Sequence, residues 1–340
     1  MIGYYVHHRG PAHLHRMQRV ADRLDTPMCV LSSLPPPARC EVPWVWLADD
    51  TASRSVVDPA ARGTLHWVPR HDAGLLARMH QISAWVERAR PALVVVDVSV
   101  EVALLVRLLG VPVVVVAQPG DEDDRAYRTA YDLADAIVAP WSPGLGLEEW
   151  PARWSAKATH VGAFSRFDGR ARWRGLREPS EVPRGLLLWG TEDDATVQQL
   201  ARRLQEATPG WSWEVAGRGR LHGPAHLWRA LCTADVVVAD AGQDTVADLA
   251  AARGHAVVVA DEHLVDGQRH TARALDRAGL AVGLERWPAD EAWPAVLRAA
   301  RDRGGSTWSR WADGRGAERM AGALEGLVSR LGPRPVRVHA

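Results

Sequence analysis

Short runs of consecutive apolar residues alternate along the chain with longer segments in which apolar residues recur at every third or fourth position. The runs predict strands buried on both faces, as in parallel sheets, and the longer segments predict amphipathic helices. We expect strands at residues 2–6, 28–32, 42–47, 93–96, 111–117, 136–139, 185–189, 211–216, 236–239 and 256–260. We expect helices at residues 14–24, 75–88, 227–231, 245–252, 291–303 and 318–331, and further helices that begin near residues 99, 125, 195 and 267.

This alternation predicts an α/β fold with two Rossmann-like, doubly wound domains. In such sheets ligands bind at the carboxyl ends of the strands, and two such domains are expected to face each other across a cleft. We expect an N-terminal domain at residues 1–162, a linker at 163–183 and a second domain at 184–316. Residues 317–340 are expected to form a terminal helix that packs back towards the first domain, followed by a tail.

Composition narrows the classes of function. The formal net charge is zero, so no global field directs the chain to nucleic acid. Three cysteines form neither a disulfide framework nor a zinc-ligand spacing, which favours a reducing, cytoplasmic setting. We also find no apolar run of the roughly 20 residues needed to cross a bilayer, and no signal segment at the N-terminus.

One stretch carries the most specific pattern. A predicted buried strand at residues 236–239 is followed by Gly242, and a helix begins shortly after. Glycine allows a close approach that a Cβ would crowd, and the first amides of a helix favour anions such as phosphate. A second strand follows at once, and the segment from Asp266 to Gln268 then opens another helix.

This stretch resembles the nucleotide-sugar half of GT-B glycosyltransferases, in particular the branch that contains MurG, the peptidoglycan N-acetylglucosaminyltransferase. The resemblance is carried by Gly242, Thr245, Asp248, Asp266 and Gln268. It implies that the acidic residue early in the helix binds the donor ribose and that the glutamine-containing stretch approaches donor phosphate or sugar. The alternation of strands and helices resembles the family over most of the chain, but specific residue motifs match only within residues 235–279.

Two positions in this stretch depart from the family pattern. Asp248 is one methylene shorter than the usual glutamate, and Arg269 stands where MurG has a second glutamine.

The resemblance implies further donor-binding residues. Gln243 and Thr245 are expected near phosphate, and Gly190 and Thr191 form the first turn of the second domain, which in relatives lies near the donor phosphates. The acids at 192–194 follow directly and would repel a diphosphate unless they are turned away or offset. Arg218, in a basic glycine-rich loop, is a candidate to offset them; a solvated loop is the alternative.

The first domain carries the candidate base. His13 lies near the start of the first helix, after Gly10, where GT-B enzymes often have Gly-x-Gly-His; Ala12 replaces the second glycine. In several branches this histidine takes the acceptor proton, and an imidazole is a suitable base near neutral pH. Asp97, at a strand's carboxyl end, is the first candidate partner of His13, and Glu101 is the second. Alternatively, His13 only caps its helix or faces solvent, and Asp97 only caps the helix that follows it.

Metal readings are alternatives that we do not favour. His7, His8 and His15 lie near His13, but adjacent residues on a strand point to opposite faces. Asp121 and Asp123 have an Asp-x-Asp spacing, although acids at a helix start suit the helix dipole without any metal. We therefore expect metal-independent chemistry and no cofactor.

The function expected from the resemblance is that of an inverting glycosyltransferase. It would move a hexosyl or N-acetylhexosaminyl group from a nucleotide-diphospho-sugar, UDP-linked by family habit, to an acceptor hydroxyl. The acceptor is unknown; in the MurG-like branch it is often lipid-linked, which implies peripheral contact with the cytoplasmic membrane face. The alternatives are a nucleotide-sugar 2-epimerase of the same fold and a non-catalytic GT-B-like partner subunit, which the acidic turn and Ala12 favour.

Overall fold

The computed structural model describes residues 1–8, 11–38, 40–51, 56–120, 124–145, 149–173, 182–190, 194–217, 223–261 and 267–332. The chain divides into two compact units. Unit 1 comprises Met1–Pro140, Glu149–Val161 and Ala317–Ala340, and unit 2 comprises Trp141–Glu148 and Gly162–Gly316. The predicted linker falls within the range of unit 2, with residues 174–181 outside the described residues; the predicted domain boundaries stay a prediction.

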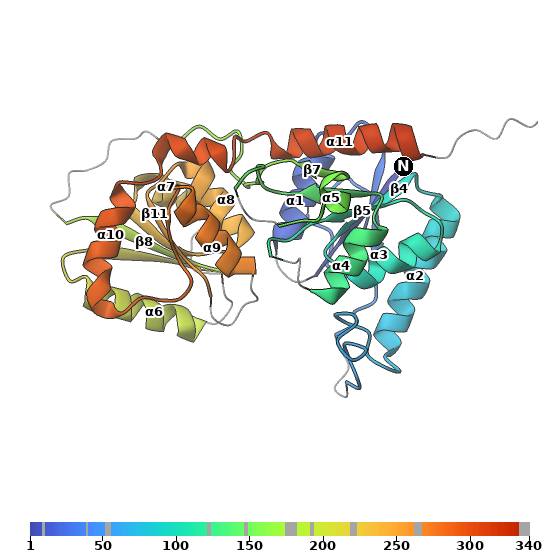
Figure 1. Ribbon diagram of the computed structural model, residues 1–340, viewed down its shortest axis with the longest axis horizontal. Helices are drawn as coiled ribbons and strands as arrows, with labels where there is room; N and C mark the ends of the chain where they lie inside the picture. The colour runs from blue at the N-terminus through green and yellow to red at the C-terminus, as the bar shows by residue number, and fades with distance from the viewer. Residues whose placement is uncertain are drawn as a thin grey trace, which may run out of the picture. The chain divides into compact units, whose positions relative to one another are not determined.

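Unit 1, in its described part, is built on a seven-stranded parallel sheet with the order β3-β2-β1-β4-β5-β6-β7 (Figure 1). The strands are β1 (Ile2–Val6), β2 (Met28–Ser32), β3 (Trp44–Trp46), β4 (Leu93–Asp97), β5 (Val113–Val116), β6 (Ala136–Ala139) and β7 (Ala158–His160). The helices are α1 (Pro11–Ala21), α2 (Ala73–Ala89), α3 (Val100–Leu108), α4 (Arg125–Leu133), α5 (Ala152–Ser155) and α11 (Gly316–Leu331).

The central strands of this sheet are buried along their whole length, as their largely apolar sequences favour. The strand order reverses between β1 and β4: the chain first adds strands on one side of β1 and then returns to add the rest on the other. Register places Val6 beside Asp97, so both strands end at the same level. The carboxyl ends of β1 and β4 therefore form the topological switch point of unit 1, where ligands of doubly wound sheets bind.

Unit 2, in its described part, contains a five-stranded parallel sheet with the order β12-β11-β10-β8-β9. The strands are β8 (Arg184–Trp189), β9 (Ser212–Gly217), β10 (Val236–Asp240), β11 (Ala256–Val259) and β12 (Val282–Leu284). The helices are α6 (Asp194–Ala207), α7 (Pro224–Thr233), α8 (Gln243–Ala252), α9 (Gly267–Arg277) and α10 (Trp293–Arg301), with 3-10 turns at Asp290–Ala292 and Gly305–Arg310.

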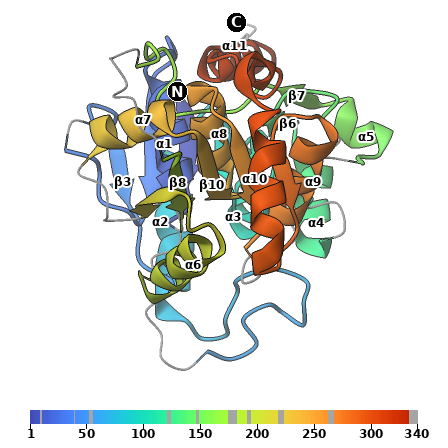
Figure 2. The ribbon, with the colours of Figure 1, turned by 90° about the vertical axis from the view of Figure 1, so that its left-hand side faces the viewer.

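One core cluster of unit 2 lies between its sheet and the helices α6 and α10, which supply Val197, Leu204 and Leu297 to pack with strand side chains such as Val238 and Val257. Figure 2 shows these two helices in front of β8 and β10. The switch point of this sheet lies between β8 and β10, because the order reverses there.

The predicted α/β class with parallel, doubly wound sheets is confirmed in both units. The helix after the Gly242 turn ends at Ala252, where the predicted helix also ends, and Arg253 takes the left-handed position that follows, with φ of 54°.

The last helix, α11, belongs to unit 1 although its sequence follows unit 2. The Glu325 carboxylate accepts hydrogen bonds from the backbone amides of Asp25 and Thr26, at 3.0 and 2.8 Å, and from the Thr26 hydroxyl. Arg319 donates to the Val161 carbonyl. The terminal helix is thus fixed to the α1–β2 connection and to the end of β7.

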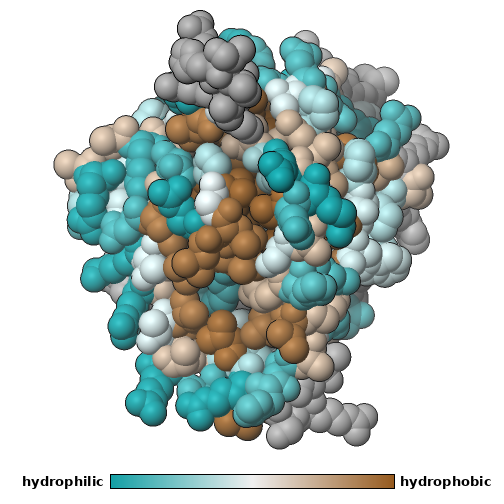
Figure 3. Space-filling view, turned by 90° about the vertical axis from the view of Figure 1, so that its right-hand side faces the viewer, coloured by the Kyte–Doolittle hydropathy of each residue, from teal (hydrophilic) through white to brown (hydrophobic). Residues whose placement is uncertain are grey.

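Apolar side chains also reach the surface. Figure 3 shows them gathered in the middle of one face. Leu76 and Leu108 are the most exposed large apolar side chains that the structure describes, at 73% and 82%. Across the described ranges, every helix is too short or too polar to cross a membrane.

Candidate functional site

The switch point of unit 1 holds a histidine–carboxylate pair. His13 is the third residue of α1, and Asp97 is the last residue of β4; His13 Nδ1 lies 2.8 Å from Asp97 Oδ1. The Arg16 guanidinium donates to the same oxygen at 2.6 Å, and the Tyr4 hydroxyl donates to Oδ2 at 3.1 Å. The contact expected between His13 and Asp97 is present, while their catalytic role stays a prediction.

Burial and neighbouring charges determine whether Asp97 is ionised. Asp97 is completely buried, which alone would raise its pKa, but Arg16, His13 and Tyr4 together hold the pKa of this carboxyl well below its usual range. Burial, and the negative charge of Asp97 beside it, raise the pKa of the Tyr4 hydroxyl. Asp97 is therefore an ionised, acceptor-only group near neutral pH.

The tautomer of the neutral His13 ring follows from its partner. Because the Asp97 carboxylate can only accept, Nδ1 must carry the proton, and Nε2 on the other side of the ring keeps its lone pair. A carboxylate that holds an imidazole in this way also stabilises the imidazolium that forms when the ring takes a proton. The arrangement can therefore act as a general base.

The backbone at this point is strained. Val98, between Asp97 and the Ser99 cap of α3, has a φ of 64°. For a β-branched residue the left-handed region is unfavourable by roughly 1–2 kcal/mol. Such strain persists where the surrounding structure over-determines it, and it accumulates at functional sites. It turns the chain from β4 into α3 directly beside the carboxylate.

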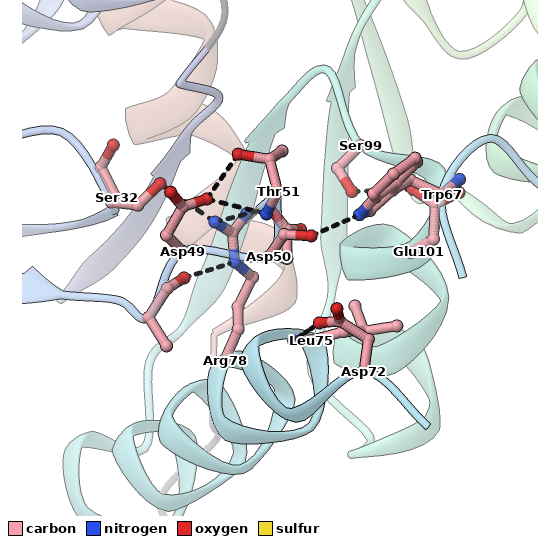
Figure 4. Close-up of polar contacts among 12 residues, drawn as sticks. Ser32, Asp49, Asp50, Thr51, Trp67, Asp72, Leu75, Arg78, Ser99 and Glu101 are labelled. Carbon is pink, nitrogen blue, oxygen red and sulfur yellow. Dashed lines mark hydrogen bonds and ion pairs between the residues drawn. The ribbon is translucent and has the colours of Figure 1, made fainter. Parts of the chain in front are cut away.

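A pocket of about 130 Å³ opens beside the pair in unit 1. The lining residues combine histidines and acids with apolar side chains: Tyr5, His7, His8, Asp50, Thr51, His66, Trp67, Leu75, Arg78, Met79, Ser99, Glu101 and Val102. The pocket is connected to the pair through His7, whose ring centroid lies 6.1 Å from that of His13. Figure 4 shows side chains of the 49–51 loop, α2 and the start of α3 pointing toward one another here.

Glu101, the second predicted partner of His13, has other partners. One carboxylate oxygen accepts from the backbone amides of His66 and Trp67, at 2.8 and 3.0 Å, and the other accepts from the Ser99 hydroxyl at 3.0 Å. Glu101 thus holds the 66–67 segment against α3 and shapes one wall of the pocket.

Arg78 braces the opposite wall from within α2. Its guanidinium is buried, pairs with Asp50 at 3.0 Å and donates to the Tyr5 hydroxyl at 2.9 Å and to the Ala48 carbonyl at 3.0 Å. The Trp67 indole donates to the Asp50 carbonyl at 2.9 Å (Figure 4). These bonds fix the 48–50 loop as a rigid side of the pocket.

In unit 2, three predicted donor-binding residues converge on a carboxylate that sequence reasoning missed. Asp240, the last residue of β10, accepts from the Gly190 amide at 2.5 Å and from the Gly242 amide at 2.7 Å. The Thr245 hydroxyl also hydrogen-bonds to it. Burial raises the pKa of Asp240, with the charge of Asp261 acting in the same direction, while the two amides and Thr245 act against the shift.

Asp248, the predicted ribose-binding residue, is 1% exposed. Its carboxylate accepts from the Ser165 hydroxyl at 2.8 Å and pairs with the Arg166 guanidinium at 2.8 Å. Burial raises the pKa of Asp248 to about 6, with Arg166 and Ser165 acting in the opposite direction. A ribose could reach this carboxylate only after Ser165 and Arg166 leave it, and the ribose role stays a prediction.

The structure also describes two other predicted donor residues, Gln243 and Gln268. Gln243 is the first residue of α8, and the side-chain oxygen of Gln268, in the first turn of α9, accepts from the Asp261 amide at 2.9 Å. Several predicted residues lie outside the described ranges: Gly10, Thr191, Arg218 and Asp266, together with the acids Asp121, Asp123, Glu192 and Asp193.

Within the described ranges, we find no group of three or more His, Cys, Asp or Glu side chains arranged to hold a metal ion. Arg16 was missed although it lies three residues after His13, on the same face of the predicted helix. Asp240 was missed although, like Asp97, it is an acid that ends a buried strand. The position of Asp240 at the end of an apolar run was the sequence signal that could have found it.

Comparisons with known proteins add the fold family. No protein-family model and no curated sequence matches the chain. Solved structures do match over nearly the whole length. The glycosyltransferase of kitacinnamycin has a TM-score of 0.64 at 14% identity, covering 98% of this chain and 99% of its own. MurG from Acinetobacter baumannii has a TM-score of 0.61 at 15% identity, covering 96% and 99%. The spinosyn forosaminyltransferase SpnP has a TM-score of 0.64 at 14% identity, covering 96% and 99%.

These likenesses define the class: the chain has the GT-B fold with two Rossmann-like units, as the sequence predicted. At this level of identity they establish the fold alone, and activity has to be argued from the sites.

Proposed function

We propose that the protein is an inverting glycosyltransferase that moves a sugar from a nucleotide-diphospho-sugar to an acceptor hydroxyl without a metal ion. The observation that carries this proposal is the His13–Asp97 pair at the switch point of unit 1 in a GT-B fold. Unit 1 would bind the acceptor and unit 2 the donor.

His13 supplies the base for a single displacement. The acceptor oxygen bonds to the anomeric carbon while the bond from that carbon to the diphosphate oxygen breaks, and the diphosphate leaves with the electron pair. The hydroxyl proton passes to His13 Nε2, and Asp97, bonded to Nδ1, stabilises the imidazolium. Attack from the face opposite the leaving group inverts the anomeric configuration.

The acceptor is proposed to enter the pocket beside the pair. Trp67, Leu75 and Met79 give the pocket an apolar lining, and His7 lies on the side of the pocket that is nearer to His13. A small hydroxylated molecule with an apolar part fits this lining, and one solved neighbour, SpnG, was crystallised with spinosyn aglycone. A lipid-linked acceptor is the alternative from the MurG-like branch, and it would bring the protein into peripheral contact with a cytoplasmic membrane face.

The donor nucleotide has two leading candidates. UDP is the default of the MurG-like branch, and SpnG, with a TM-score of 0.55 to this chain, was crystallised with thymidine diphosphate. A thermal-shift and calorimetric screen of UDP, dTDP, GDP and their sugars separates these candidates.

His13→Ala should leave nucleotide affinity unchanged and lower kcat by about 10²–10⁴-fold, because a positioned base contributes that much. The measurement is turnover with the best donor from the screen, alongside calorimetry of the nucleotide alone. His15→Ala, two residues further on α1, is the matched control and should retain turnover. Full activity in the His13 variant would remove the base assignment.

A non-catalytic partner subunit stays a second candidate, because Asp240 and the Asp248–Arg166 pair already engage the predicted phosphate and ribose positions. Absence of binding for every nucleoside diphosphate would favour it. The 2-epimerase alternative predicts isomerisation of the donor with no acceptor present.

A further inference from the structure

The two glycines predicted to face donor phosphate face a side chain instead. A Cβ added at Gly242 would lie 2.6 Å from Asp240 Oδ1, and one added at Gly190 would lie 3.0 Å from Oδ2. A side chain at either position would therefore force the carboxylate of Asp240 to shift, because that carboxylate lies against the backbone of both turns.

This carboxylate has the position and the partners of a bound oxyanion. It joins the turn after β8 to the turn after β10, the two turns at the switch point of unit 2, and it takes one backbone amide from each. The Thr245 hydroxyl completes the set. Charge-assisted bonds from backbone amides are the interactions that GT-B relatives are expected to offer a diphosphate here.

We propose that Asp240 is a built-in anion that occupies the phosphate position of unit 2, so that a donor diphosphate must compete with it for the Gly190 and Gly242 amides. The proposal rests on the proposed function, since it concerns the donor of that reaction. Asp240 is then a specificity-determining residue: it lowers the affinity of the site for the diphosphate part of any nucleotide.

Two charges cannot share the position. A diphosphate placed on the same amides would meet the Asp240 carboxylate at contact distance, where like charges in a buried setting repel strongly. Binding would require the carboxylate to take up a proton or to turn away, and the raised pKa of Asp240 makes the proton easier to accept. In either case the diphosphate should add little to the affinity of the nucleoside.

The first test uses the unaltered protein. Calorimetry compares uridine with UDP and thymidine with dTDP at pH 7.5. We expect the diphosphate to improve affinity by less than tenfold over its nucleoside. An improvement of tenfold or more would overturn the proposal while leaving the proposed function standing.

The second test removes the charge. Asp240→Asn and Asp240→Ser should each lower the Kd for UDP or dTDP at least tenfold, because both free the amides from a competing anion. Asp240→Glu, which keeps the charge, should give no gain. The matched control is Asp235→Asn: Asp235 precedes β10 at its other end and accepts from the Arg184 amide at 2.8 Å, so it bridges β8 and β10 in the same way.

The outcomes separate the two hypotheses. Tighter binding by the Asn and Ser variants but not by the Asp235 variant supports the proposal. Unchanged or weaker binding in folded Asn and Ser variants overturns it alone. Failure of the unaltered protein and of both variants to bind any nucleoside or nucleoside diphosphate overturns it together with the donor role of unit 2.

Discussion

One residue, Asp97, receives a ring N–H, a guanidinium and a phenol hydroxyl while it is completely buried. Its ionised state therefore contributes to stability as well as to the proposed base. Because the folded pKa is depressed, this contribution is fully present above the unfolded value, about 3.9, and is lost as pH falls through the folded pKa.

Asp97→Asn should lower the free energy of unfolding by about 3–5 kcal/mol at pH 7, since it leaves the buried Arg16 without its counter-charge. Urea denaturation of the variant and the unaltered protein at pH 7, 5 and 3 measures this. The difference should narrow below pH ~4, where the unaltered protein loses the contribution.

Asp58→Asn is the control for this prediction. Asp58 pairs with Arg70 at 2.9 Å, but the Arg70 side chain is 57% exposed and that of Asp58 is 27% exposed, so its removal should change stability by about 1 kcal/mol or less. Equal effects of the two substitutions would mean that Asp97 contributes no more than a surface ion pair.

Asp248 has the opposite pH dependence. An acid whose folded pKa is raised to about 6 binds its proton more tightly when folded, so its contribution is most favourable below about pH 4 and declines as pH rises to about 6. The stability of the unaltered protein relative to Asp248→Asn should therefore fall by about 1–3 kcal/mol between pH 4 and pH 7. Chemical denaturation across that range measures it. A relative stability that rises with pH would show that the Arg166 pair outweighs burial.

At the residue scale, the sequence predicted a contact only where a side chain suited to catalysis also lay at the end of an apolar run. His13 and Asp97 could be predicted because each follows or ends an apolar run at the same sheet edge. The partners of Asp248 could not: Ser165 and Arg166 lie 83 and 82 positions away, in a segment without periodicity. Glu101 lines the candidate pocket, but its oxygens bond to a loop whose path the sequence does not reveal.

At the scale of elements, the buried strands were predictable because runs such as Val113–Val116 and Leu93–Asp97 have few polar residues to suggest anything else. The three-residue edge strands Ala158–His160 and Val282–Leu284 were missed, since so few residues show no period. These segments form strands because they pair with the edge of a sheet, which is a tertiary interaction that the local sequence does not show.

Helix α2 shapes the proposed acceptor pocket through a glycine. A Cβ at Gly74 would lie 2.0 Å from the Asp49 carbonyl oxygen and 3.1 Å from the Asp50 Cα, so Gly74→Ala must push the first turn of α2 away from the 49–50 loop. We expect the acceptor KM to rise several-fold and stability to fall by about 1–3 kcal/mol. Nucleotide affinity, which we assign to unit 2 in the proposed function, should not change. Steady-state kinetics and calorimetry measure the two quantities.

Gly322→Ala in α11 provides the comparison, because no atom lies within 4 Å of the added methyl group. Replacing a glycine in a helix interior should stabilise the protein by about 0.5–1 kcal/mol and leave both ligands unaffected. An unaltered acceptor KM in a folded Gly74 variant would argue against the pocket as the acceptor site.

At the scale of the molecule, the two units should respond to different ligands. A ligand that binds a folded unit suppresses opening of the backbone around its site. Hydrogen exchange with a saturating nucleoside diphosphate should slow in peptides covering β8, β10 and the start of α8, and remain unchanged in β1 and α1. Nucleotide-induced protection confined to β1 and α1 would assign the donor to unit 1 instead.

The path of the chain has a practical consequence for taking the protein apart. A polypeptide that stops after Val161 lacks Glu325 and the helix that carries it, so the amides of Asp25 and Thr26 lose their acceptor. Simple truncation should therefore yield an incomplete, poorly soluble product. A circularly permuted gene that begins at residue 317, joins residue 340 to Met1 and ends at residue 161 would encode every segment of unit 1, together with Trp141–Glu148 of unit 2. The excised middle, residues 162–316, would lack that short segment and would need it added back to be complete.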